Sequence, residues 1–80
     1  MARIFITGSA DGLGQLSAAA LLKQGHEVVL HARNPERARH AKVKVPGAEH
    51  VVVGDLSSIE GAKHAVDEAN ALGRFDAVIH

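Results

Sequence analysis

The chain has 80 residues, enough for one domain at most, and 46% of them are hydrophobic while 22% are charged, which argues against a disordered chain. Its formal net charge is zero, so nothing draws it as a whole to nucleic acid or to a membrane surface. It contains no cysteine and no apolar run near the roughly 18 residues of a membrane span, so we expect no disulfide scaffold, no thiolate metal site and no membrane partner, and a cytoplasmic location.

The first third of the chain predicts a strand, a glycine-rich turn and a helix. Residues 3–6 form a short apolar run that is typical of a buried strand. The turn that follows leads into residues 13–24, where apolar residues recur at helical spacing. Gly25 stands where a helix-terminating glycine is expected.

A second strand and a basic helix come next. Residues 27–31 predict another buried strand, and Asn34 with Pro35 has the pattern of an N-cap followed by the first helical position. We expect a short helix over residues 35–42. Its end stays open, because residues 43–45 alternate like a strand.

The last part predicts a strand, a helix and a final strand. Residues 51–53 and 76–80 are apolar strand candidates. Between them, Ser57 and Glu60 have the spacing of a capping box, in which Ser57 accepts from the Glu60 amide. One apolar helical face is expected to comprise Ile59, Ala62, Val66, Ala69 and Leu72. Apolar runs that alternate with helices predict a parallel α/β sheet with right-handed crossovers.

The glycine-rich turn predicts a dinucleotide site. Gly8, Gly12 and Gly14 allow a tight turn, close approach to a pyrophosphate, and close packing of helix against strand. The phosphates would meet the free amides at the helix N-terminus. Ser9 can add a hydroxyl donor, and Asp11 can fasten the loop or reach a ribose hydroxyl. The alternative is a purely structural turn.

Residues 7–14 follow the pattern Thr-Gly-x-x-x-Gly-x-Gly, which resembles the cofactor motif of the short-chain dehydrogenase/reductase family. Asp11 stands where the extended, epimerase-like branch has glycine, so the similarity is to the ordinary single-domain branch. It covers all 80 residues and implies the first four strands, in order 3-2-1-4, of a three-layer, doubly wound Rossmann-like sheet. The chain would thus be a partial NAD(P)-binding domain, 1–80, of a longer parent protein. The resemblance implies cofactor contacts from Gly8, Ser9, Asp11, Gly12, Leu13 and Gly14.

The resemblance also bears on the choice of cofactor. Ala32 stands where family members that prefer NAD carry an aspartate, and Arg33 follows it. An arginine there can hold a phosphate with two hydrogen bonds, and Asn34 can add its amide. The resemblance therefore implies NADP(H) rather than NAD(H), unless Arg33 belongs to a solvated surface. We interpret four further basic residues as a solvated helix surface: Arg37, Arg39, Lys42 and Lys44.

Asp55 and Leu56 follow the third predicted strand. The resemblance implies that Asp55 accepts from the adenine amine and that Leu56 packs on the adenine ring. The alternative is that Asp55 merely begins the turn into the next helix.

The resemblance implies that the parent protein is an oxidoreductase that moves hydride between nicotinamide and a small-molecule carbonyl or alcohol. The family's catalytic pair is Tyr-x-x-x-Lys, and this chain has no tyrosine, so no catalytic residue is assigned. The six histidines show no metal-binding spacing. Alternatives are a non-catalytic dinucleotide sensor and a flavin- or NAD-binding domain. The exposed edge of the last strand predicts a homo-oligomer.

Overall fold

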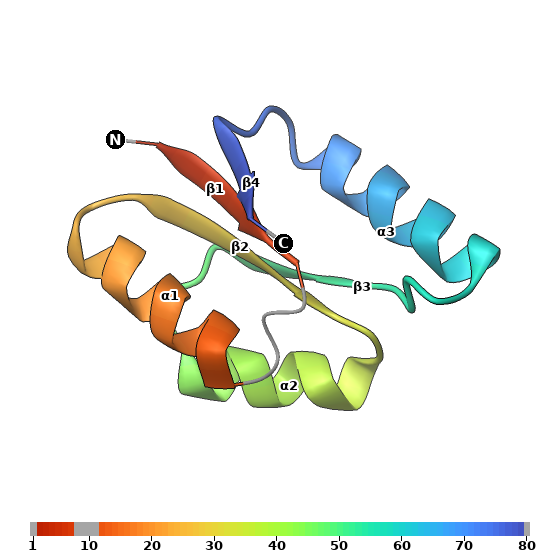
Figure 1. Ribbon diagram of the computed structural model, residues 1–80, viewed down its shortest axis with the longest axis horizontal. Helices are drawn as coiled ribbons and strands as arrows, with labels where there is room; N and C mark the ends of the chain where they lie inside the picture. Colours follow the sequence, from red (N-terminus) through yellow and green to blue (C-terminus); the bar gives the residue numbers. More distant parts are fainter. Residues whose placement is uncertain (1, 8–11, 80) are drawn as a thin grey trace.

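The computed structural model describes residues 2–7 and 12–79, in which strands and helices alternate along the chain (Figure 1). The elements are β1 (Arg3–Ile6), α1 (Gly12–Lys23), β2 (Glu27–Ala32), α2 (Pro35–Lys44), β3 (His50–Val53), α3 (Ile59–Ala71) and β4 (Ala77–Ile79). Each predicted element is present at its expected place in the chain, with ends that differ by a few residues.

The strands form one parallel sheet in the order β3-β2-β1-β4. Ile4 pairs with Val28 across β1 and β2, and Leu30 pairs with Val51 across β2 and β3. Helices α1 and α2 lie on one face of the sheet and α3 lies on the other (Figure 1). This confirms the predicted three-layer, doubly wound arrangement with strand order 3-2-1-4.

The alternation of side chains along the strands produces two apolar clusters, one on each face of the sheet. The cluster beneath α1 and α2 comprises Ile4, Ile6, Ala18, Val28, Leu30, Ala41, Val45 and Ala48. The cluster beneath α3 comprises Val29, Val52, Ala65 and Ala69, with Phe5, Leu72 and Phe75 packed against it. The rings of Phe5 and Phe75 stack with centroids 5.3 Å apart.

Helix α2 begins as predicted and ends later than the sequence pattern indicated. Asn34 is its N-cap, and the Asn34 Oδ1 accepts from the Arg37 amide at 2.8 Å. The strand-like residues Val43 and Lys44 belong to the helix, and Val45 is the C-cap. Val43 is exposed to solvent while Val45 is buried in the apolar cluster beneath α2. The strand-like alternation of residues 43–45 is therefore the end of a helix whose C-cap valine packs against the sheet.

The predicted capping box at Ser57 is wrong by one residue. Ser58 is the N-cap of α3, and its Oγ accepts from the Gly61 amide at 2.9 Å. Ser57 is instead held by the side chain of Asp55, which accepts from both its amide and its hydroxyl. The carboxylate of Asp55 draws Ser57 into the turn and leaves the next serine to cap the helix.

The predicted apolar face of α3 is wrong in part. Ile59 is 89% exposed and Val66 is 56% exposed, whereas Ala65 and Ala69 are buried against the sheet. Small side chains let the helix approach β3 closely, so the buried stripe follows the alanines rather than the larger residues.

In the described part of the chain, no helix has the length and apolarity needed to cross a membrane.

Candidate functional site

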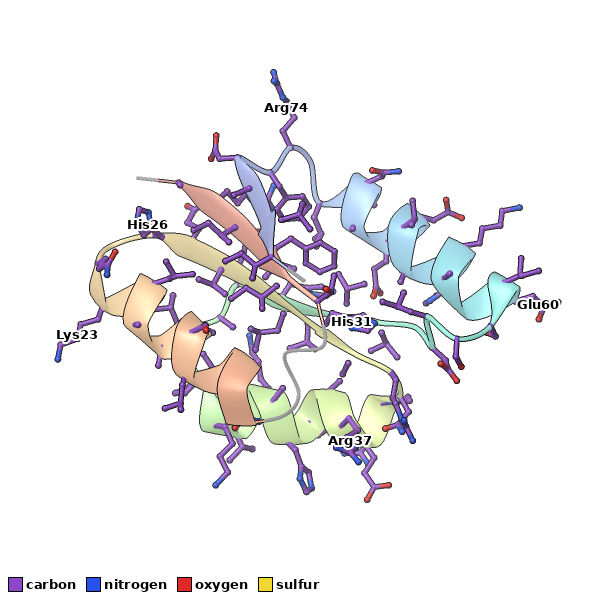
Figure 2. The ribbon with its side chains drawn as sticks, in the orientation of Figure 1. Lys23, His26, His31, Arg37, Glu60 and Arg74 are labelled. Atoms are coloured by element: carbon purple, nitrogen blue, oxygen red, sulfur yellow. The ribbon has the colours of Figure 1, made fainter. Side chains whose placement is uncertain are left out.

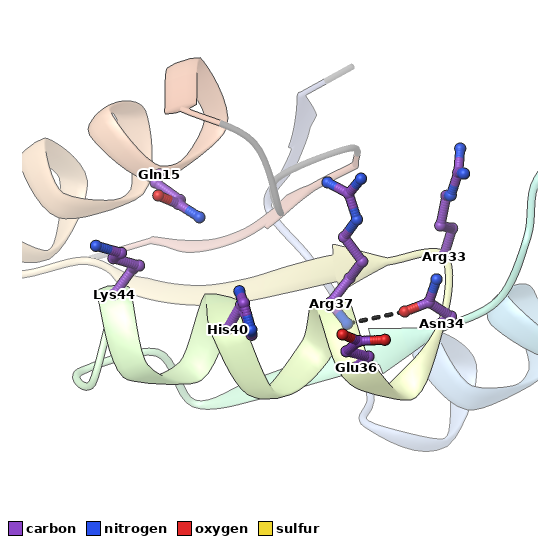
Figure 3. Close-up of a pocket in the computed structure, with 7 residues that line it drawn as sticks. All are labelled: Gln15, Arg33, Asn34, Glu36, Arg37, His40 and Lys44. Carbon is purple, nitrogen blue, oxygen red and sulfur yellow. Dashed lines mark hydrogen bonds between the residues drawn. The ribbon is translucent and has the colours of Figure 1, made fainter.

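An open pocket of about 470 Å³ lies beside the end of β2 and the start of α2 (Figure 3). It is lined by Gln15, Arg33, Asn34, Glu36, Arg37, His40 and Lys44. Two of the predicted cofactor residues, Arg33 and Asn34, therefore lie in one pocket, together with five residues that the sequence did not assign to the site. Helix α1 contributes Gln15, and α2 contributes the other four.

Arg33 extends from the point where β2 leaves the sheet. Ala32, the last residue of β2, is buried, while Arg33 is exposed and points past the strand end (Figure 3). The Oδ1 of Asn34 is used in capping α2, so the group that Asn34 can offer a ligand is its amide NH₂. The corner thus presents a guanidinium and an amide, both hydrogen-bond donors.

Asp55 lies in the turn between β3 and α3. Its Oδ1 accepts from the Ser57 amide at 3.0 Å and from the Ser57 hydroxyl at 2.7 Å. These bonds, assisted by the nearby charge of Arg33, hold the pKa of the Asp55 carboxyl below its ordinary value. The carboxylate is therefore ionised at neutral pH. Its other oxygen, Oδ2, has no hydrogen-bond partner among the described residues and is able to accept from a ligand.

Leu56 lies in a different hollow from Arg33. It is 48% exposed and lines an apolar groove of about 340 Å³ between α3 and the sheet. The groove is lined by Phe5, Thr7, His31, Leu56, Ala65, Val66, Ala69, Asn70, Phe75 and Val78. The pocket with the basic residues lies on the side of the sheet covered by α1 and α2, whereas the apolar groove lies on the side covered by α3. Asp55 precedes Leu56 in the turn between β3 and α3.

The glycine-rich turn is only partly within the described residues. Gly8, Ser9 and Asp11 lie outside them, while Gly12 begins α1 and Leu13 and Gly14 belong to its first turn.

Thr7, at the start of that turn, ties the ends of two strands together. Its amide and its Oγ1 both donate to the Ile79 carbonyl, at 2.8 Å and 3.2 Å. These bonds hold the ends of β1 and β4 together where the predicted phosphate-binding turn begins.

His31 is a buried polar residue that sequence reasoning did not single out. It is 4% exposed, and its Nε2 lies 2.7 Å from the Gly54 carbonyl oxygen, which makes Nε2 the donor (Figure 2). The bond joins the end of β2 to Gly54, the residue that follows β3. A histidine inside an otherwise apolar strand was the available signal. Among residues 2–7 and 12–79, no group of three or more histidine, aspartate or glutamate side chains is placed to hold a metal ion.

Comparison with known proteins supplies the family. A family model described as short chain dehydrogenase matches residues 2–80. An uncharacterized oxidoreductase from Emericella nidulans is 62% identical over 80 residues, which are all of this chain and 31% of that relative. The chain therefore spans about a third of the relative's length.

Solved structures agree with this match. The structure of NAD+-bound xylitol dehydrogenase has a TM-score of 0.79 at 26% identity and is matched over 96% of this chain and 31% of that one. The Pseudomonas aeruginosa RhlG/NADP active-site complex has a TM-score of 0.77 at 32% identity, over 95% of this chain and 32% of that one. The first of these proteins is bound to NAD+ and the second is in complex with NADP.

Proposed function

The chain belongs to the short-chain dehydrogenase family, and from this premise we propose that it is the NADP(H)-binding part of an oxidoreductase. The parent protein would transfer hydride between the nicotinamide and the carbonyl or alcohol carbon of a small-molecule substrate. The observation that carries the choice of NADP(H) is Arg33, exposed at the end of β2 directly after the small, buried Ala32.

The donors at this corner fit a phosphate. Arg33 makes no hydrogen bond or ion pair with any described residue, so its five N–H donors are available. Asn34 keeps an amide donor beside it. A 2′-phosphate held there would gain charge-assisted, bidentate hydrogen bonds, whereas a ribose hydroxyl would leave the guanidinium without an anion.

Other contacts are proposed for the rest of the cofactor. The pyrophosphate would lie on the glycine-rich turn, against Gly8, Ser9, Asp11, Gly12, Leu13 and Gly14. Asp55 would accept from the adenine amine through Oδ2, and Leu56 would pack on the ring. The bound nicotinamide supplies the hydride-transfer chemistry, and the residues of this chain bind and orient it. No tyrosine is present to act as acid or base, so the proposed role of these 80 residues is cofactor binding.

One acidic residue favours the competing cofactor. Glu36 lines the same pocket as Arg33, and a carboxylate there is able to accept from the ribose hydroxyls of NAD(H). Glu36 lies in the first turn of α2 rather than at the end of β2, where the family pattern places that acid. The affinities for the two cofactors therefore decide between Arg33 and Glu36.

The test is a calorimetric titration of the full chain with NADPH and with NADH. We expect NADPH to bind more tightly, and Arg33→Ala to weaken NADPH about 10- to 100-fold while NADH changes less than about twofold, because a hydrogen bond to a charged group contributes about 1.5–3 kcal/mol. Arg39→Ala removes the same charge outside the pocket and serves as the control. Equal affinities for the two cofactors, or an unchanged NADPH affinity in Arg33→Ala, would contradict the proposal.

Self-association is a further expectation for this fold. Val78 and Ile79 of β4 are 50% and 39% exposed, and the apolar groove lies next to them. Parallel sheets are normally covered on both faces, so we propose that this face is buried in a homo-oligomer. Light scattering that finds a monomer at all concentrations would contradict this.

A further inference from the structure

The basic residues of α2 divide into two groups that the sequence did not separate. Arg37, His40 and Lys44 line the pocket that contains Arg33, and they lie three and four residues apart, on one side of the helix (Figure 3). Arg39 and Lys42 are outside this pocket and line a different hollow, on the side of β3. Arg37 is solvent-exposed, as predicted for the basic surface of this helix, and it faces the pocket that contains Arg33.

Neither Arg33 nor Arg37 forms an ion pair within the described part of the chain, although Asp55 is close enough for the charge of Arg33 to lower the pKa of its carboxyl. Neither guanidinium forms an ion pair or a hydrogen bond with another described residue, and Glu36, although it lines the same pocket, is not within ion-pair distance of either. Lys42, by contrast, donates to the Ala48 carbonyl at 2.7 Å. Two guanidinium groups that line one pocket repel each other, and an anion bound between them would relieve that repulsion.

The start of α2 holds Arg37 in this place. The Asn34 Oδ1 accepts from the Arg37 amide at 2.8 Å, which fixes the first turn of the helix relative to the end of β2. In Figure 3 the side chains of Arg33 and Arg37 extend to the same side of that turn, away from the helix axis. The turn therefore offers two guanidinium groups, and the amide of Asn34, to one ligand.

We propose that Arg37 is a second specificity-determining residue, which binds the 2′-phosphate of NADP(H) together with Arg33. This inference rests on the proposed function. The pyrophosphate is assigned to the glycine-rich turn before α1, so the anion that remains for a pair of arginines at the end of β2 and the start of α2 is the 2′-phosphate. A phosphate with close to two negative charges matches two guanidinium groups better than one.

The experiment compares Arg37→Ala with Arg39→Ala in the full chain. The two variants remove the same charge from the same helix, one inside the pocket and one outside it. Dissociation constants are measured for NADPH, NADH and 2′-AMP, a small probe that carries the 2′-phosphate without the nicotinamide half. We expect Arg37→Ala to weaken NADPH and 2′-AMP about tenfold and NADH less than about twofold, and Arg39→Ala to change all three less than about twofold. Arg37→Lys, which keeps the charge but loses the planar fork, should fall between wild type and Arg37→Ala.

Three outcomes overturn the proposal, and they are distinguishable. If wild type binds NADPH no better than NADH, the proposed function itself fails. If NADPH is preferred and Arg33→Ala removes the preference, while Arg37→Ala leaves NADPH within twofold of wild type, only the role of Arg37 fails. If Arg37→Ala weakens NADPH and NADH equally, Arg37 supports the local fold rather than the phosphate, and the circular dichroism and melting temperature of that variant should then change as well.

Discussion

Gly61, in the first turn of α3, packs against the backbone of the Asp55 turn too closely to tolerate a side chain. A Cβ built on Gly61 would lie 2.2 Å from the Asp55 carbonyl oxygen, 2.8 Å from the Asp55 amide nitrogen and 2.7 Å from the Ser58 Oγ. Two of these atoms belong to the backbone and cannot move away by a rotamer change. Gly61→Ala therefore forces α3 and the turn apart.

The magnitude follows from two opposing effects. Alanine in place of glycine in a helix gains at most about 1 kcal/mol in propensity, while an overpacked contact costs typically about 1–3 kcal/mol. With a backbone atom at 2.2 Å, we take the upper end, which leaves a net loss of about 2 kcal/mol in the free energy of unfolding. For a domain of this size, that corresponds to a fall of roughly 8–16 °C in melting temperature.

Urea denaturation of the full chain measures this loss, with Ala62→Gly as the matched variant. Ala62→Gly is expected to cost about 1 kcal/mol from propensity alone. Because the Asp55 turn is displaced, Gly61→Ala should also weaken NADPH and NADH in parallel, since both carry adenine. An unchanged or increased free energy of unfolding in Gly61→Ala would refute the steric reasoning, because the propensity gain would then stand alone.

Three further changes test other parts of the structure. The hydrogen bonds from Ser57 lower the pKa of Asp55, so the stability they contribute is present above the unfolded pKa of 3.8 and is lost as the pH falls through the folded pKa. The difference in melting temperature between wild type and Ser57→Ala should therefore shrink from pH 6 to pH 3. A difference that stays constant over this range would contradict the prediction. Arg3 joins the start of β1 to Glu49 and lies over the Phe75 ring, so Arg3→Met should lower the melting temperature by more than Arg74→Met, and equal effects would argue against it. His31→Leu leaves the buried Gly54 carbonyl oxygen without its donor and should lower the free energy of unfolding by about 1–3 kcal/mol, measured by urea denaturation. His31→Gln, which keeps a donor, should be closer to wild type. The reverse ranking of the two variants would exclude that hydrogen bond as the cause.

The sequence predicted the strands, the helices and their layering because each signal is local. Apolar runs such as Val28 to Leu30 indicate buried strands, and Asn34 followed by Pro35 indicates a helix start. Gly25, with a φ of +91°, ends α1 in the left-handed conformation that favours glycine, as its place after the helical pattern predicted.

The remaining features depend on how elements meet in space. Arg37 and Arg39 differ by two positions in a basic stretch, and only the placement of α2 next to α1 and the end of β2 separates them. The capping pattern favours Ser57, because Glu60 follows it at the expected spacing, but the carboxylate of Asp55 binds the Ser57 hydroxyl and Ser58 caps the helix instead. Ile59 belongs to an apolar helical repeat, yet α3 turns its alanines to the sheet because small residues permit close approach.

The binding of NADP(H) through Arg33 is tested most directly by the crystal structure of the full chain bound to NADP(H). If NADP(H) binds as proposed, the oxygens of the 2′-phosphate will lie within hydrogen-bond distance of the Arg33 guanidinium, with Arg37 on the same phosphate and the pyrophosphate at the start of α1. A 2′-phosphate directed into solvent, away from the end of β2, would contradict the assignment of Arg33 and with it the choice of NADP(H).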